Sequence, residues 1–250
     1  MAFNLLPTNI AHYQVANAPP TAYYIPNFIT KDEEEFLIEQ VCLPQVYAAP
    51  KPKWTQLSNR RLQNWGGIPH PKGMVAEKLP KWLELYTEKV SALGVFQDKK
   101  PNHVLVNEYE SGQGIMPHED GPLFYPVIST ISLGSHAILN YYHHPTSQVK
   151  SQATESDIQA VDKVCPLEDR LFASLLLEPC SLLISKDDIY SKYLHGINES
   201  TTDTLTVKVC NLNSCPGRKP GDLLERNTRI SLTIRHVPKV LKVKLKLGKR

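Results

Sequence analysis

The sequence predicts a mainly β protein with flanking helices, which places it in the α+β class. Three observations lead to this prediction. The chain contains 20 prolines against 12 glycines, which is high for a helical bundle and typical of many loops and short strands. After residue 102, short segments with the alternation of β-strands follow one another, with turn residues between them. Hydrophobic residues make up 41% of the chain and charged residues 21%, close to ordinary globular usage, so a disordered or fibrous chain is excluded.

The first eighty residues are predicted to contain one strand, one helix and much irregular structure. Residues 1–20 are polar and end in two prolines, which favours a loosely packed arm, and residues 23–26 have the composition of a short strand. Thr30 predicts the N-cap of a helix, and Glu33 completes a capping box. Residues 44–81 are rich in Pro, Trp, Lys and Arg and lack periodicity, so we expect a loop or hairpin region there.

The rest of the chain is predicted to form one more helix and a series of strands. A helix is expected from about residue 79 to 93, with an apolar stripe made of Trp82, Leu85, Tyr86 and Val90. Strands are expected at 103–109, 129–133, 137–142 and 229–237, with two more around a turn within 175–184. Residues 145–168 are polar and turn-rich and are interpreted as an insertion. So many short strands suggest a sandwich or a jelly roll.

Changes in composition divide the chain into an N-terminal extension (1–95), a β-rich core (96–238) and a basic tail (239–250). The net charge of +3 hides an asymmetry, because residues 235–250 carry seven Lys or Arg and no acid, whereas residues 1–234 carry 21 basic and 25 acidic residues. The tail alternates apolar residues with lysine. This pattern suits an edge strand whose lysines deter aggregation, an arm that contacts phosphates, or a nuclear-import patch, and the three interpretations stay open.

The tripeptide His118-Glu119-Asp120 carries the strongest chemical signal. In extended backbone, side chains two residues apart point to the same face, so the imidazole of His118 and the carboxylate of Asp120 can bind one ion. His195, after another strand-rich segment, is a candidate third ligand. Two histidines and one carboxylate form the facial triad of non-haem Fe(II) oxygenases, which leaves coordination positions open for other ligands. Alone, a His-x-Asp pair is common by chance.

The order of further motifs makes the assignment more specific. The chain has Asn-x-Tyr at 107–109, His-x-Asp at 118–120, His-Gly at 195–196, and Arg-x-Ser-x-Thr-x-Arg at 229–235. In this order the motifs resemble those of the AlkB-like family of Fe(II)/2-oxoglutarate-dependent dioxygenases, over roughly residues 23–237. Three further stretches look like one eukaryotic subgroup of this family, namely residues 51–58, 62–67 and 114–122.

The resemblance implies a double-stranded β-helix, that is, a jelly-roll core in residues 96–238, with an N-terminal lid of the nucleotide-recognition type. It also implies that iron is held by His118, Asp120 and His195. The cofactors would then be Fe(2+), 2-oxoglutarate as cosubstrate, and O2. Succinate and CO2 would form as a C–H bond of the substrate is hydroxylated, and an N-methyl product would break down to an amine and formaldehyde.

The same resemblance assigns five residues to the binding of 2-oxoglutarate. Arg229 would pair with the distal carboxylate through its planar guanidinium, and Asn107 and Tyr109 would form hydrogen bonds to the cosubstrate. Arg235 lies six residues after Arg229, so both face the same side of the strand. Ser231 lies where many relatives have Asn, and its shorter side chain leaves room for a water.

The resemblance also implies a nucleic-acid substrate, because AlkB-like relatives mostly act on alkylated bases. Residues 50–82 contain seven Lys or Arg against one acid, with Trp54 and Trp65 among them, and this is the pattern that phosphate contact and base stacking need. We therefore name Trp54, Arg61, Trp65 and Tyr125 as candidate substrate contacts. The alternative is that the tryptophans only pack the lid and that Tyr125 is a core aromatic.

Three functions remain open at this point. The favoured one is oxidative demethylation of DNA or RNA, followed by an oxygenase acting on a protein or small molecule, and by a non-catalytic nucleic-acid-binding protein of the same fold. The chain has no signal-peptide pattern and no apolar run near the roughly eighteen residues of a membrane span. We expect a monomer of the cytoplasm and nucleus that binds nucleic acid and no membrane.

Overall fold

Two antiparallel sheets packed face to face form the centre of the protein. The computed structural model describes residues 9–42, 54–145 and 165–241. The larger sheet has seven strands, in the order β1, β10, β7, β14, β5, β3, β2. These strands are β1 (Ala22–Ile25), β2 (Thr55–Leu57), β3 (Arg60–Trp65), β5 (His103–Tyr109), β7 (Val127–Leu133), β10 (Leu182–Lys186) and β14 (Arg229–Arg235).

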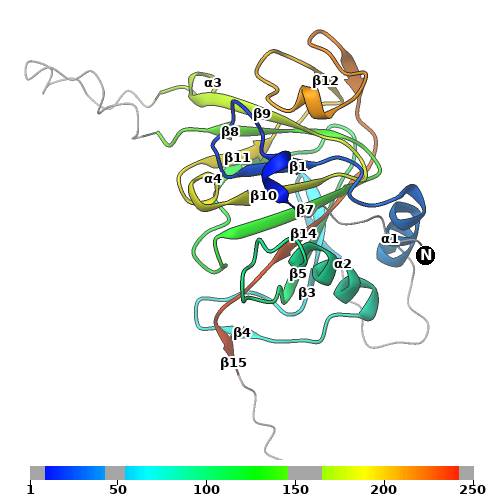
Figure 1. Ribbon diagram of the computed structural model, residues 1–250, viewed down its shortest axis with the longest axis vertical. Coiled ribbons are helices and arrows are strands. Elements are labelled where there is room, and N and C mark those ends of the chain that lie inside the picture. The colour runs from blue at the N-terminus through cyan, green and yellow to red at the C-terminus, as the bar shows by residue number, and fades with distance from the viewer. Residues whose placement is uncertain (1–8, 43–53, 146–164, 242–250) are drawn as a thin grey trace, which may run out of the picture.

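The smaller sheet has four strands in the order β6, β11, β8, β9. They are β6 (Ile115–His118), β8 (Ala137–Tyr142), β9 (Leu171–Leu177) and β11 (Leu194–Ile197). Two short pairs lie outside the main sheets: β12 (Thr202–Thr204) with β13 (Leu223–Glu225), and β4 (Met74–Val75) with β15 (Val240–Leu241). Figure 1 shows the two sheets one above the other, as in a jelly roll, and this arrangement confirms the predicted fold class.

The helices are few and short. They are η1 (Ile10–Tyr13), α1 (Lys31–Cys42), α2 (Lys81–Ser91), α3 (Leu167–Arg170), α4 (Asp187–Ser191) and η2 (Leu212–Ser214). The two longer ones, α1 and α2, lie on the side of the large sheet that faces away from the small sheet (Figure 1). The molecule therefore has three layers: helices, large sheet and small sheet. Among the described residues, no helix has the length and apolar character needed to cross a membrane.

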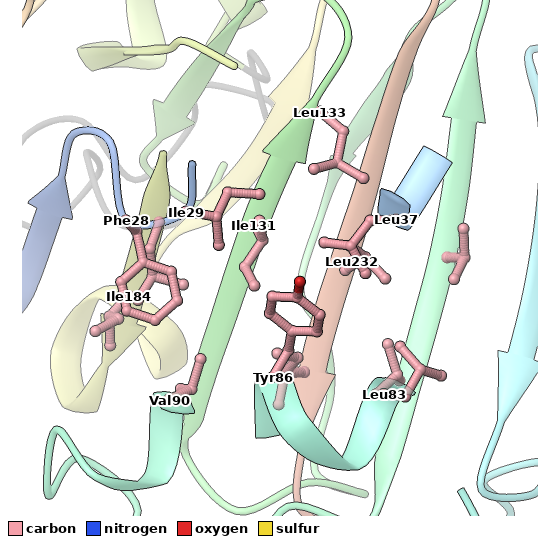
Figure 2. Close-up of a cluster of buried hydrophobic side chains, with 14 of the residues drawn as sticks. Phe28, Ile29, Leu37, Leu83, Tyr86, Val90, Ile131, Leu133, Ile184 and Leu232 are labelled. Atoms are coloured by element: carbon pink, nitrogen blue, oxygen red, sulfur yellow. The ribbon is translucent and has the colours of Figure 1, made fainter. Parts of the chain in front are cut away.

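The outer core lies between the helices and the large sheet. In Figure 2, Leu83, Tyr86 and Val90 of α2 point toward Ile131 of β7 and Leu232 of β14. These side chains are almost completely buried. Because side chains alternate along a strand, the residues of β14 that flank Leu232 must face the other way, toward the small sheet. This alternation decides which side chains can reach the space between the sheets.

The start of α1 forms as the capping box predicts. The Oγ1 of Thr30 accepts a hydrogen bond from the backbone N–H of Glu33 at 3.1 Å, and Oε2 of Glu33 accepts one from the N–H of Thr30 at 2.8 Å. Two backbone donors that a helix start leaves without partners are thereby satisfied. The helix then buries Leu37 and Val41 against the large sheet.

We predict that Thr30→Ala lowers the free energy of unfolding by about 1 kcal/mol, because the N-cap acceptor is lost and the rest of α1 is unchanged. Urea denaturation followed by circular dichroism measures this change. An unfolding midpoint equal to that of the wild type would show that the capping box does not contribute to stability.

Most expected elements are present. Strands β5 and β8 have the predicted bounds, and residues 55–65 form a hairpin inside the region expected to be a loop or hairpin. The stripe predicted for α2 omitted Leu83, which is buried, whereas Trp82 and Leu85 are only partly buried against the same core.

The expected division at residue 95 remains a prediction. Strands β1, β2 and β3 come from the N-terminal part and join the same sheet as strands from the core part. Of the expected basic tail, β15 pairs in parallel with β4, while residues 242–250 lie outside the described part of the chain. The same holds for residues 1–8, 43–53 and 146–164, which include parts of the predicted arm, loop region and insertion.

Candidate active site

A cavity of about 120 Å³ lies between the two sheets. The large sheet contributes the alternate residues that face away from the helices: Leu105, Asn107 and Tyr109 on β5, Ile128 and Thr130 on β7, and Arg229, Ser231, Thr233 and Arg235 on β14. On the opposite side lie apolar side chains of the small sheet together with His118, Tyr141 and His195, and Asp120 follows from the turn after β6. The cavity therefore combines aliphatic side chains with many convergent polar and charged groups.

The three predicted metal ligands come together at this cavity. His118 ends β6 and is the direct cross-strand partner of His195 on β11, so both imidazoles lie on one face, with ring centroids 4.5 Å apart. Asp120 follows two residues after His118, and its Oδ2 lies 3.6 Å from Nε2 of His195. One ligand atom of each residue lies within 4.8 Å of the other two. This group of two histidines and one carboxylate fits the facial triad of an Fe(II) site.

The surroundings of these three side chains favour the protonation states that bind a cation. The Nδ1 of His118 donates to the carbonyl of Met116 at 2.8 Å, which leaves Nε2 as the ligand atom. Burial lowers the pKa of His195 to about 4, so this imidazole is neutral and its lone pair is available. Burial also opposes ionisation of Asp120, but Arg235 and the two histidines outweigh it and lower the pKa of this carboxyl. The donor set therefore suits a divalent ion at neutral pH.

Gly196 holds β11 close to β6 beside the ligand His195. A Cβ on Gly196 would lie 2.8 Å from the carbonyl oxygen of Ile115 and 2.9 Å from the nitrogen of Pro117. Both atoms belong to the backbone of β6 and cannot rotate away. The close approach of the two strands thus requires glycine at this position.

We predict that Gly196→Ala costs about 1–3 kcal/mol of stability and weakens metal binding, because the two strands that carry the histidines are pushed apart. Urea denaturation and titration with Fe(II) under argon measure the two effects. Wild-type values for both would mean that the strands adjust without moving the histidines.

Arg229 lies at the other end of the cavity and lacks a counterion. Its side chain is buried, and burial lowers the pKa of its guanidinium to about 10. The Nη2 donates to Oγ of Ser132 at 2.9 Å, while Nε is buried without a hydrogen-bond partner. None of the ion pairs among the described residues includes Arg229. A buried cation in this state fits the carboxylate of a bound molecule.

The other predicted 2-oxoglutarate contacts line the same cavity. Tyr109 is the direct cross-strand partner of Arg229, and Asn107 is the partner of Ser231. All four side chains face the small sheet and are at least nine-tenths buried. Arg235 also lines the cavity, but its Nη2 is bonded to Oδ1 of Asp120. The structure thus places Arg235 against a metal ligand, and its predicted contact with the cosubstrate remains a prediction.

None of the four candidate substrate contacts lines this cavity. Trp65 is buried in the outer core, where it meets Trp82 at 5.4 Å between ring centroids. Arg61 pairs with Glu108 at 2.6 Å and lies over the ring of Trp54, which packs against the same core. The reason is the pairing of β3 with β5. Arg61 is aligned with Glu108, and both point to the helix side of the sheet.

Tyr125 is likewise not part of the cavity lining. Its ring lies between Phe96 and His236, at 6.5 Å and 6.3 Å between ring centroids, and packs against the outer core. The alternative of a core aromatic therefore describes Tyr125 better than a channel residue.

Among the cavity residues that the sequence interpretation did not select are Arg60, Tyr141 and Tyr190. Tyr190 donates to the carbonyl of Gly121 at 2.5 Å and so fastens α4 to the turn after Asp120. Burial raises the pKa of Tyr190 to about 12, so its hydroxyl stays protonated and remains a donor. The signal for Arg60 was its place in β3, one residue before Arg61 and hence on the opposite face.

Comparison with known proteins agrees with this site. A family model described as the 2OG-Fe(II) oxygenase superfamily matches residues 21–235. The chain belongs to this superfamily. It is 54% identical over 242 residues to a zebrafish (Danio rerio) protein named "Probable RNA/DNA demethylase ALKBH6", which covers 97% of this chain and 96% of the relative. This similarity confirms the resemblance to the AlkB-like family, and specifically to its AlkB homolog 6 subgroup.

More distant relatives share the fold. "Uncharacterized protein L905" of Acanthamoeba polyphaga mimivirus is 27% identical over 86% of this chain and 84% of its own length. The solved structure of OsALKBH1 superposes with a TM-score of 0.52 at 17% identity, covering 88% of this chain and 99% of that one. At this identity the match shows the fold alone.

As a member of this superfamily, the protein is a dioxygenase that uses Fe(II), 2-oxoglutarate and O2. Iron supplies the oxidation of a substrate C–H bond that amino acid side chains cannot perform. The chain's own residues bind and orient. His118, Asp120 and His195 form the donor set for iron, and Arg229 offers a buried cation without a counterion to a carboxylate.

Proposed function

We propose that this protein oxidatively demethylates alkylated nucleic acid, DNA or RNA, with release of succinate, CO2 and formaldehyde. The observation that carries the proposal is the 54% identity, over 97% of this chain, to a relative named as a probable RNA/DNA demethylase. The cavity supports it independently, because it brings a His-Asp-His group and a buried arginine without a counterion to the same space.

In the proposed reaction, the residues of the cavity bind the cosubstrate and orient the substrate. Arg229, Tyr109 and Asn107 would bind the distal carboxylate of 2-oxoglutarate at the end of the cavity away from the histidines. Asp120 is held by Arg235, so that one carboxylate oxygen stays turned toward His195. The substrate methyl group then enters from the side where His118 and His195 keep some exposure to solvent.

The test is a panel of single- and double-stranded DNA and RNA oligonucleotides that carry N-methylated bases. Purified protein is supplied with Fe(II), 2-oxoglutarate and air. Formaldehyde and succinate should appear in equal amounts from at least one oligonucleotide, and Asp120→Ala should abolish both. The unmethylated twin of each oligonucleotide is the matched control and should yield no formaldehyde.

Two results would contradict this function. Turnover with a methylated peptide or small molecule but with no oligonucleotide would make the protein an oxygenase for another substrate class. No binding of iron and 2-oxoglutarate in a thermal-shift titration would instead favour a non-catalytic nucleic-acid-binding protein.

We also propose that the protein is a monomer of the cytoplasm and nucleus. The basic tail at 239–250 supports nuclear entry as one of its three interpretations. Light scattering after gel filtration should give the 28.2 kDa of one chain, and a larger mass would overturn the monomer. The fluorescently tagged protein should appear in both compartments, and exclusion from either one would overturn the localisation.

A further inference from the structure

We infer that Arg60 binds a phosphate of the nucleic acid next to the methylated base. This inference rests on the proposed function and names a residue that recognises the substrate. Arg60 begins β3 and faces the cavity, because Leu62, two residues on, is the cross-strand partner of the cavity residue Asn107. Its Nε donates to Oδ1 of Asn107 at 3.2 Å.

Among the charged groups of the cavity, one arginine has no anionic partner. The lining contains three arginines, Arg60, Arg229 and Arg235, and a single acid, Asp120. Asp120 pairs with Arg235, and the distal carboxylate of 2-oxoglutarate is assigned to Arg229. The C1 carboxylate, the second anionic group of the cosubstrate, is assigned to Fe(II). Arg60 then has no anion, and none of the ion pairs among the described residues includes it.

The position of Arg60 favours the substrate over the cosubstrate. Arg229, Tyr109 and Asn107 are buried, whereas Arg60 is only half-buried, as are His118 and His195. Because Arg61 is aligned with Glu108, Arg60 lies beside Tyr109, and its partial exposure places it where the cavity opens to solvent. A guanidinium at the mouth of the cavity suits an anionic group that stays outside while a neighbouring base enters, and a phosphodiester is such a group.

A hydrogen bond holds the hairpin of β2 and β3, which carries Arg60, against the mouth of the cavity. Asn59, in the turn between β2 and β3, donates from Nδ2 to Oε1 of Glu199 at 2.5 Å. Glu199 lies two residues after β11, the strand of His195. The turn thus connects the large sheet to the small sheet beside the site, and the bond from Arg60 to Asn107 fixes the inner end of the same segment. Both contacts hold the guanidinium in place before substrate arrives.

The experiment compares Arg60→Gln with Arg61→Gln, which removes the same charge from the same strand on its opposite face. The probe is a short fluorescein-labelled single-stranded oligonucleotide, in the sugar type and with the methylated base that support turnover. Binding is measured by anisotropy with Fe(II) and 2-oxoglutarate under argon, between low and moderate salt. A second probe carries neutral methylphosphonates on both sides of the methylated base.

Arg60→Gln should weaken binding about tenfold or more and lower the slope of log affinity against log salt by about 0.7, the value of one single-strand phosphate contact. Arg61→Gln should leave both nearly unchanged in protein whose folding is verified by circular dichroism. On the methylphosphonate probe the wild type should bind as weakly as Arg60→Gln, and the variant should lose nothing further. Arg60→Lys should recover the salt slope and part of the affinity.

Each contrary outcome is distinguishable. If the wild type turns over oligonucleotides and Arg60→Gln binds them with wild-type affinity and slope, the inference alone is wrong. A raised KM for 2-oxoglutarate in Arg60→Gln, with oligonucleotide binding unchanged, would make Arg60 a positioning residue for the cosubstrate and would also overturn the inference. If the wild type neither binds nor demethylates any oligonucleotide, the proposed function itself fails and the inference fails with it.

Discussion

Replacing Arg229 with methionine should raise the KM for 2-oxoglutarate by at least about 30-fold, while the protein remains as stable as the wild type or becomes more stable. The two effects have one cause. The guanidinium of Arg229 is buried without a carboxylate partner, so in the absence of ligand it destabilises the fold, and in its presence it supplies the counterion. Methionine fills a similar volume and needs no partner.

Steady-state succinate formation at increasing 2-oxoglutarate gives the KM, and thermal unfolding without metal and cosubstrate gives the stability. Arg229→Lys is the matched control. It keeps the charge but not the planar fork, so its KM should fall between those of the wild type and the methionine variant. A methionine variant with wild-type KM would show that another residue binds the distal carboxylate. A large loss of stability would show that Arg229 contributes to the fold through Ser132.

The alternation along β14 explains why much of the site could be predicted. Ile230, Leu232 and Ile234 had to face a core, and therefore Arg229 and Arg235 had to face the opposite side together. Asn107 and Tyr109 were named from the resemblance, and the same alternation places both on one face of β5. These positions follow from one strand at a time and need no knowledge of its neighbours.

The hairpin strand β3 shows where this reasoning stops. Its residues alternate too, but both faces carry polar groups, so the sequence does not reveal which arginine faces the cavity. The register decides: Arg61 is aligned with Glu108, and Arg60 consequently faces the cavity. The sequence interpretation chose Arg61, whereas Arg60 is the arginine of β3 that faces the cavity. A shift of one residue is enough to turn a side chain to the other face of a sheet.

The prediction that the tryptophans contact nucleic acid rested on a different kind of pattern. Basic and aromatic residues close together in sequence suggested a surface for nucleic acid, yet Trp65 meets Trp82 of a helix that lies 17 positions further along the chain. Composition does not distinguish a stacking platform from the packing of a helix on a sheet. Only the third layer of the fold, formed by α1 and α2, settles which face of β3 is covered.

Asp120→Asn should reduce turnover at least about 100-fold and weaken iron binding, whereas Glu119→Gln, one residue away, should change neither. Both substitutions remove one negative charge beside His118. Asp120 is almost completely buried, lies 3.6 Å from His195 and is bonded to Arg235. Glu119 points outward, where its carboxylate is 44% exposed and pairs with His144 at 3.0 Å.

The comparison separates coordination from general electrostatic attraction of the cation. Iron affinity is measured by titration under argon, and turnover is measured as succinate released. If both variants lost affinity equally, the triad would act through its charge rather than as ligands, and the assignment of Asp120 would be wrong. The amide in Asp120→Asn still offers an oxygen to Arg235, so the variant should fold, with a stability loss of about 1–3 kcal/mol for the weakened buried contact.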